Sequence, residues 1–186
     1  MRVVDNMTEE VAARLVKLAL VAGATEVEAG VAEGEEFECT VRLGELETLK
    51  EAGSSAAGVR VFRGKKTGTS STSDLSDEGL RRMVASAMAL SEVSMDDPHA
   101  GLPAPEELGA AEGDFELYHA DIEAVPPEER ITLARQAEKA ALDFDPRIKN
   151  SEGGSYGSSI STRAFANSLG FVGSYKTSSC SLSVVS

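Results

Sequence analysis

The sequence predicts an α+β protein, in which a two-layer domain of two helices and an antiparallel meander sheet is followed by a connector, a helix and a β-rich region. Three observations lead to this prediction. Apolar residues recur at helical spacing near residues 7–22 and 76–90. Apolar and polar residues alternate between residues 25 and 73, and the same alternation returns at 180–184.

The first predicted helix covers residues 7–22 and ends before Gly23. From residue 25 to 73 the period changes to two, and glycines recur at turn-like intervals, which predicts four or five consecutive antiparallel strands. A second helix begins after Ser76, because Asp77 and Glu78 suit a first helical turn. Together these elements make up a predicted N-terminal domain of residues 1–95.

Residues 96–126 are predicted to form an acidic, proline-rich linker. The chain has a net charge of −13, and the stretch from residue 96 to 129 holds eleven Asp and Glu residues and no Lys or Arg. The same stretch has five of the six prolines. We expect an extended, solvated connector that proteases cut readily. An acidic surface also disfavours nucleic acid as a partner.

A third helix is predicted over residues 127–145, because Pro127, Glu128 and Glu129 form a favourable helix start and Pro146 prevents its continuation. Residues 146–186 are then predicted to begin a β-rich C-terminal domain. Twelve of the last 37 residues are Ser, and Cys180, Leu182 and Val184 alternate with serines. This pattern continues to Ser186, which predicts that the domain is truncated there.

Several functional classes are disfavoured by the sequence. The chain has neither an apolar run of membrane-spanning length nor a secretory leader pattern, so no membrane contact and a cytoplasmic location are expected. The Gly64–Thr67 stretch departs from a phosphate loop in spacing, and Gly153–Gly157 lacks the downstream histidine of a serine hydrolase. Without an HExxH motif, we expect no catalytic, cofactor or metal residues within these 186 positions.

Four stretches, in this order and spacing, resemble the TldD/PmbA family, whose members have been described as modulators of DNA gyrase and belong to a peptidase system. They are GVRVFRGKKTGTSSTSDLSDEGL at 58–80, DDPHAGLP at 96–103, RIKNSEGGSY at 147–156 and FANSLGFVGSY at 165–175. The Ser73–Ser76, Phe115–His119 and Asn150–Gly153 segments are more similar to the PmbA (TldE) branch than to TldD.

The resemblance implies the N-terminal part of a longer protein and a role as the non-catalytic PmbA/TldE-like subunit of a heterodimer with a TldD-like partner. In the family, TldD has a zinc motif of the HExxxH kind in its C-terminal half, and the assembly degrades unfolded peptides, including a peptide-antibiotic leader and an antitoxin. One alternative is the N-terminal half of a zinc metallopeptidase whose metal site lies beyond residue 186. A further alternative is a regulator that binds gyrase directly.

Contact with peptide or with a partner subunit is predicted at the Ser/Gly-rich strands after residue 150. A peptidase that accepts varied unfolded segments is expected to hold them by main-chain pairing to a strand edge, and small side chains leave that edge accessible. An unpaired edge near the end of the chain also predicts self-association. The candidate residues are Asn150, Ser151, Glu152, Gly153, Leu182 and Val184.

Overall fold

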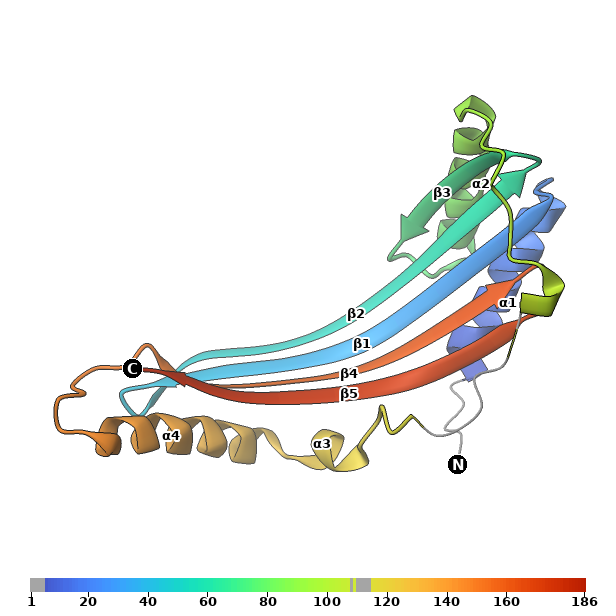
Figure 1. The fold of residues 1–186 in the computed structure, drawn as a ribbon. Helices are drawn as coiled ribbons and strands as arrows, with labels where there is room; N and C mark the ends of the chain where they lie inside the picture. The colour runs from blue at the N-terminus through green and yellow to red at the C-terminus, as the bar shows by residue number, and fades with distance from the viewer. Residues whose placement is uncertain (1–5, 108, 110–114) are drawn as a thin grey trace. The chain divides into compact units, whose positions relative to one another are not determined.

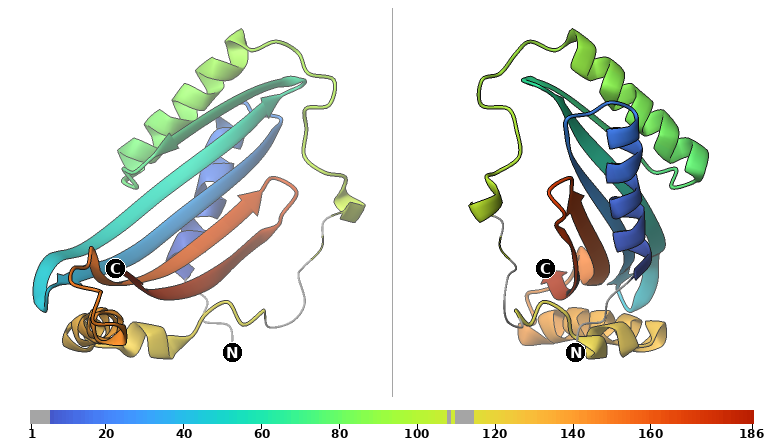
Figure 2. Two further views of the ribbon diagram at one scale, coloured as in Figure 1. Left: turned by 60° about the vertical axis from the view of Figure 1, so that its left-hand side comes forward. Right: turned by 90° about the vertical axis from the view of Figure 1, so that its right-hand side faces the viewer.

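The structure is a computed structural model that describes residues 6–107, 109 and 115–186. Five strands form one sheet in the order β3-β2-β1-β4-β5, as Figure 1 shows. The strands are β1 (Glu26–Arg42), β2 (Glu45–Arg63), β3 (Lys66–Thr72), β4 (Gly153–Asn167) and β5 (Val172–Val185). One sheet of five strands, together with the helices described below, confirms the α+β prediction. The strands of the β-rich part, β4 and β5, extend the same sheet next to β1 (Figure 2).

The prediction of four or five strands between residues 25 and 73 was wrong, because this part of the chain forms three. Only two of the glycines there make turns: Gly44 and Gly64 have φ of 82° and 62°, a conformation that glycine adopts without strain. Gly34, Gly53 and Gly58 lie inside strands. The long strands β1 and β2 therefore continue through positions that look like breaks in the sequence.

The chain folds as two compact units, each assembled from three separate chain segments. The first consists of Met1–Glu33, Ser54–Asp114 and Thr162–Lys176, and the second of Gly34–Gly53, Phe115–Ser161 and Thr177–Ser186. The strands β1, β2, β4 and β5 contribute residues to both units.

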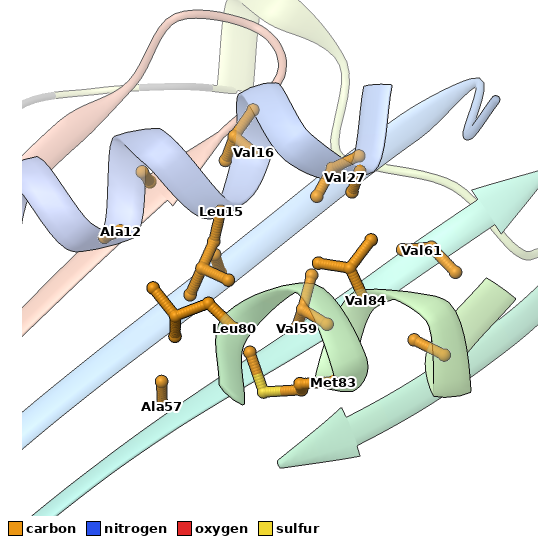
Figure 3. Packing of buried hydrophobic residues seen from close by; sticks show 14 of the residues in the cluster. Ala12, Leu15, Val16, Val27, Ala57, Val59, Val61, Leu80, Met83 and Val84 are labelled. Atoms are coloured by element: carbon orange, nitrogen blue, oxygen red, sulfur yellow. The ribbon is translucent and has the colours of Figure 1, made fainter. Parts of the chain in front are cut away.

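In the first unit, α1 (Asn6–Val21) and α2 (Asp77–Val93) pack against the sheet. Both ends of α1 lie within one residue of the predicted positions, and α2 begins directly after Ser76 as predicted. Their side chains meet those of β1 and β2 in a core that includes Leu15, Val27 and Leu80, all with no exposed surface (Figure 3). Burying each of these side chains contributes about 1.5–3 kcal/mol.

Two local features fix α2. The Ser76 hydroxyl accepts a hydrogen bond from the Gly79 backbone N–H at 3.2 Å, so Ser76 is the N-cap that the sequence predicted. Gly68 of β3 faces the helix so closely that a Cβ at this position would lie 1.9 Å from the Ala87 carbonyl oxygen. Glycine is thus required where the backbones of β3 and α2 meet.

The acidic linker is extended over part of its length but is not a free connector. In the first unit the Asp97 N–H donates to the Lys65 carbonyl at 2.9 Å, and the Leu102 N–H donates to the Glu26 carboxylate at 3.1 Å. Two short helices also lie within it, η1 (Pro105–Glu107) and α3 (Ala120–Ala124).

No helix in the described ranges is both long enough and apolar enough to span a membrane.

Candidate functional site

The second unit is built on α4 (Pro127–Phe144), which packs against β1 and β4. Its core consists of Phe37, Cys39, Val41, Ala134 and Tyr156, with Ile131 and Leu133 at the edge. Gly154 allows the close approach, because a Cβ there would lie 2.2 Å from the Ala134 carbonyl oxygen. Burial raises the pKa of both the Cys39 thiol and the Tyr156 hydroxyl, so both groups remain neutral at pH 7.

Glu138 is the only charged side chain in the described residues that is fully buried, with 1% of its surface exposed. Its carboxylate accepts hydrogen bonds from the Leu43 N–H at 2.7 Å and the Gly44 N–H at 2.9 Å. The Ser151 hydroxyl donates to the same carboxylate at 2.7 Å. Glu138 therefore joins α4, the β1–β2 turn and the turn before β4.

This arrangement keeps Glu138 ionised. Burial alone would raise the pKa of the carboxyl, but hydrogen bonds from Gly44, Ser151 and Leu43 and the charge of Arg42 outweigh it, so the pKa lies below its ordinary value of 4.5. The turn residues Leu43 and Gly44 have φ of 49° and 82°, which directs their two N–H groups to one acceptor. The carboxylate thus stabilises a turn in which Leu43 has a strained backbone conformation.

A cleft of about 400 Å³ lies beside this core in the second unit. The Arg130 guanidinium stands over the Phe37 ring, 4.7 Å from its centroid, and donates to the Val125 carbonyl at 2.8 Å. Neutral groups therefore fix the orientation of this cation. The lining comes from β1, β2, α3, α4 and β4: Glu35, Glu36, Phe37, Glu51, Ala52, Gly53, Ile122, Glu123, Arg130, Ser158, Ser159 and Ile160.

The structure places the predicted contact residues in two different environments. Asn150 and Glu152 are exposed, whereas Ser151 and Gly153 are buried, and the Ser151 hydroxyl accepts from the Gly153 N–H at 2.8 Å. Ser151 therefore bonds to Glu138 inside the protein. Glu152 lies beside the end of β5, because its N–H donates to the Val185 carbonyl at 2.9 Å.

Leu182 and Val184 lie on β5, the last strand of the sheet in the described part of the chain. Their exposed fractions are 51% and 37%, and that of the neighbouring Val185 is 60%. The Glu152–Val185 bond brings the Asn150–Gly153 turn to this strand end. The turn and the end of β5 are therefore adjacent at Glu152, and only some of the predicted residues reach the surface.

Sequence reasoning missed Glu138 and Arg130. One signal was present, since Ile131, Ala134 and Glu138 lie at helical spacing and a glutamate on an apolar face requires buried donors. For Arg130 the sequence gives no such signal, because its contact with Phe37 joins residues far apart in the chain.

Residues 6–107, 109 and 115–186 do not fit a zinc ion, because no three His, Cys, Asp or Glu side chains among them lie close enough to hold a metal.

Two domain families match the sequence: PmbA/TldA metallopeptidase domain 1 over residues 27–91 and the PmbA/TldA metallopeptidase central domain over residues 120–186. The Metalloprotease PmbA homolog of Haemophilus influenzae is 37% identical over 169 residues, which cover 90% of this chain and 37% of that protein. The Metalloprotease PmbA of Escherichia coli O157:H7 is 36% identical over 144 residues, 77% of this chain and 32% of that protein.

Solved structures share the fold. A Bacteroides thetaiotaomicron protein described as a modulator of DNA gyrase superposes with a TM-score of 0.87 at 22% identity, covering 98% of this chain and 41% of that one. TldE of Thermococcus kodakarensis superposes with a TM-score of 0.77 at 17% identity, covering 92% and 38%.

The fold and the two domain matches define a chain of a metallopeptidase family. It covers 37% and 32% of the lengths of the two PmbA relatives. The chain belongs to the PmbA/TldD family, as the resemblance predicted.

Proposed function

We propose that this chain is the N-terminal part of a PmbA/TldE-like subunit that acts, without a metal site of its own, beside a zinc-bearing TldD-like subunit in the cytoplasm. The substrates of this assembly are unfolded peptides. The observation that favours the PmbA branch is the 36–37% identity to PmbA proteins over most of the chain. The fold shared with TldE agrees with it.

The second unit supports a binding function for this chain. It exposes apolar side chains at the end of β5 beside the Asn150–Gly153 turn. We propose that Asn150, Glu152, Leu182 and Val184 contact peptide or the partner subunit there, while Ser151 and Gly153 hold the turn in place through Glu138.

A second candidate is the N-terminal half of a self-sufficient zinc metallopeptidase. Two observations favour it: the relatives are named metalloproteases, and this chain spans 37% and 32% of their lengths. In that case the metal ligands lie in sequence beyond residue 186.

Reconstitution separates the two candidates. The full-length protein that contains this chain and the TldD-like protein of the same organism are purified separately, and hydrolysis of a fluorogenic unfolded peptide is measured for each and for the mixture. We expect activity only in the mixture, abolished by a chelator, with zinc bound by the TldD-like protein. Chelator-sensitive activity and stoichiometric zinc in the full-length protein alone would contradict the proposal and support the second candidate.

A further inference from the structure

The cleft of the second unit carries an excess of negative charge. Its lining has one cation, Arg130, and four carboxylates: Glu35 and Glu36 on β1, Glu51 on β2 and Glu123 on α3. None of the residues proposed to contact peptide or a partner subunit lines this cleft. The charge of the cleft is therefore a separate feature of the second unit.

Arg130 is bound to neutral groups of the protein. Its Nε donates to the Val125 carbonyl at 2.8 Å, and a terminal N–H₂ group donates to the main-chain carbonyl of Glu123 at 3.4 Å. The guanidinium also stands over the Phe37 ring. In the described part of the chain Arg130 makes no ion pair, so it does not neutralise the carboxylates around it.

Two of the four carboxylates have a partner within the protein. Glu36 pairs with Lys50 at 3.7 Å, and the Glu123 carboxylate accepts a hydrogen bond from a tyrosine hydroxyl. Glu35 and Glu51 have no ion pair among the described residues. The cleft thus presents two carboxylates for which these residues supply no cation.

The rest of the lining decides which kind of cation fits. Phe37, Ala52, Ile122 and Ile160 supply apolar surface. In the ranges 6–107, 109 and 115–186, no three His, Cys, Asp or Glu side chains lie close enough to hold a metal ion. Carboxylates too far apart to chelate an inorganic ion, next to hydrocarbon side chains, suit an organic cation that has an aliphatic stem.

We propose that this cleft binds a primary alkylammonium group together with its aliphatic stem. The ammonium lies at Glu35 and Glu51, because Arg130 repels a second cation beside it. The ammonium N–H groups donate to the carboxylates, and the methylene groups of the stem cover Ile122 and Ile160.

Two sources carry this chemistry: a free aliphatic polyamine and a lysine side chain of a polypeptide. The proposal does not rest on the proposed function, because it needs neither a second subunit nor peptide hydrolysis. All of its tests use the 186-residue chain alone.

The first test compares two amines of equal charge. n-Pentylammonium and methylammonium each carry one positive charge, so general attraction to a chain of net charge −13 acts on both alike. Each is titrated into nitrogen-15-labelled protein at constant ionic strength, and binding is read from amide chemical shifts. We expect n-pentylammonium to bind at least about ten-fold more tightly, because its additional methylene groups are buried, with shifts at Phe37, Ala52 and Ile160.

A charge-neutralising variant places the ammonium within the cleft. Glu51→Gln removes one of the two carboxylates, and its position is exposed, so folding is not expected to change. We expect this variant to bind n-pentylammonium about five-fold more weakly than the parent. Glu45→Gln is the matched control and should bind like the parent, since it removes the same charge from an exposed position of β2 outside the cleft.

A second set of probes distinguishes the two sources. Spermidine represents the free polyamine, and N-acetyl-glycyl-lysyl-glycinamide presents a lysine side chain, with the norleucine peptide as its uncharged control. Binding of spermidine alone, weakened by Glu51→Gln, would support a free polyamine as the ligand. Binding of the lysine peptide but not of the norleucine peptide, again weakened by Glu51→Gln, would support a polypeptide side chain.

Three results would overturn the proposal. Equal affinities for n-pentylammonium and methylammonium would show that only the net charge of the chain attracts them. Equal affinities of Glu51→Gln and Glu45→Gln, or shifts confined to amides remote from the cleft, would place the cation elsewhere. Failure of both spermidine and the lysine peptide to bind would leave the site without a ligand. The reconstitution experiment is independent of all three results.

Discussion

Replacing Glu138 by Gln tests whether one buried carboxylate holds the second unit together. Gln offers one acceptor oxygen in place of two, so at least one of the three donors from Leu43, Gly44 and Ser151 faces an amide N–H₂ group. A hydrogen bond to a charged acceptor contributes about 1.5–3 kcal/mol. Because the turn at 43–44 is exposed, a backbone N–H that loses its acceptor there can partly compensate by bonding to water. We therefore expect a loss of about 2–3 kcal/mol.

Two measurements check this value. The melting temperature should fall by roughly 4–12 °C, given that 1 kcal/mol shifts a chain of this size by about 2–4 °C. Leu43 and Gly44 bond to different carboxylate oxygens, so one of these two amides faces the Gln N–H₂ group, and native-state hydrogen exchange should accelerate there. Glu129→Gln is the control, since it removes the same charge from an exposed position of the same helix.

The pH dependence follows from the depressed pKa of Glu138. Where the folded pKa lies below the unfolded one, the unfolded state binds more protons, so stability rises with pH. The contribution of Glu138 is therefore complete above its ordinary pKa of 4.5 and is lost as the pH falls through the lower folded pKa. The Gln variant should lack this acid-sensitive component. A Glu138→Gln protein as stable as Glu129→Gln, with unchanged exchange at Leu43 and Gly44, would refute the reasoning.

Two further predictions concern the first unit. Gly68→Ala places a methyl group 1.9 Å from the Ala87 carbonyl oxygen and should lower the free energy of unfolding, measured by urea denaturation, by about 1–3 kcal/mol or more. Gly58→Ala is the control and should cost little, because the nearest atom there is 3.9 Å away. Equal effects of the two changes would show that α2 adapts freely. Ser76→Ala removes the N-cap of α2 and should lower the free energy of unfolding by about 1 kcal/mol, whereas Ser76→Thr should keep most of it. An Ala variant as stable as the parent would mean that the Gly79 N–H bonds to water instead.

The helices were predictable because their signals are local. The apolar spacing before Gly23, the Ser76 cap and the Pro127 start each lie within a few residues of the element they define. The strands of the first half were located correctly but divided wrongly, since a glycine in a sequence marks a turn as readily as it marks a position inside a long strand. Only the φ values separate Gly44 and Gly64 from the glycines inside β1 and β2.

The candidate site was predictable in part. Residues 150–153 were named as candidate contact residues and the alternation at 182–184 was recognised from the sequence, whereas the position of residue 152 beside the end of β5 follows from the Glu152–Val185 hydrogen bond. That Ser151 is buried against Glu138 was not predictable, because its partner lies on a helix whose packing had to be known first.

The sequence by itself determined the α+β class, the starts of the three long helices, the charge of the linker and the family. Tertiary structure alone decided that β4 pairs with β1, that Glu138 bonds to the turn at Leu43, and that Leu117 bonds to Ser178. The physical reason is the range of the interactions. Helix caps and periodicity act over a few residues, whereas strand neighbours and buried hydrogen bonds join segments that are remote in the chain and meet only when the sheet has formed.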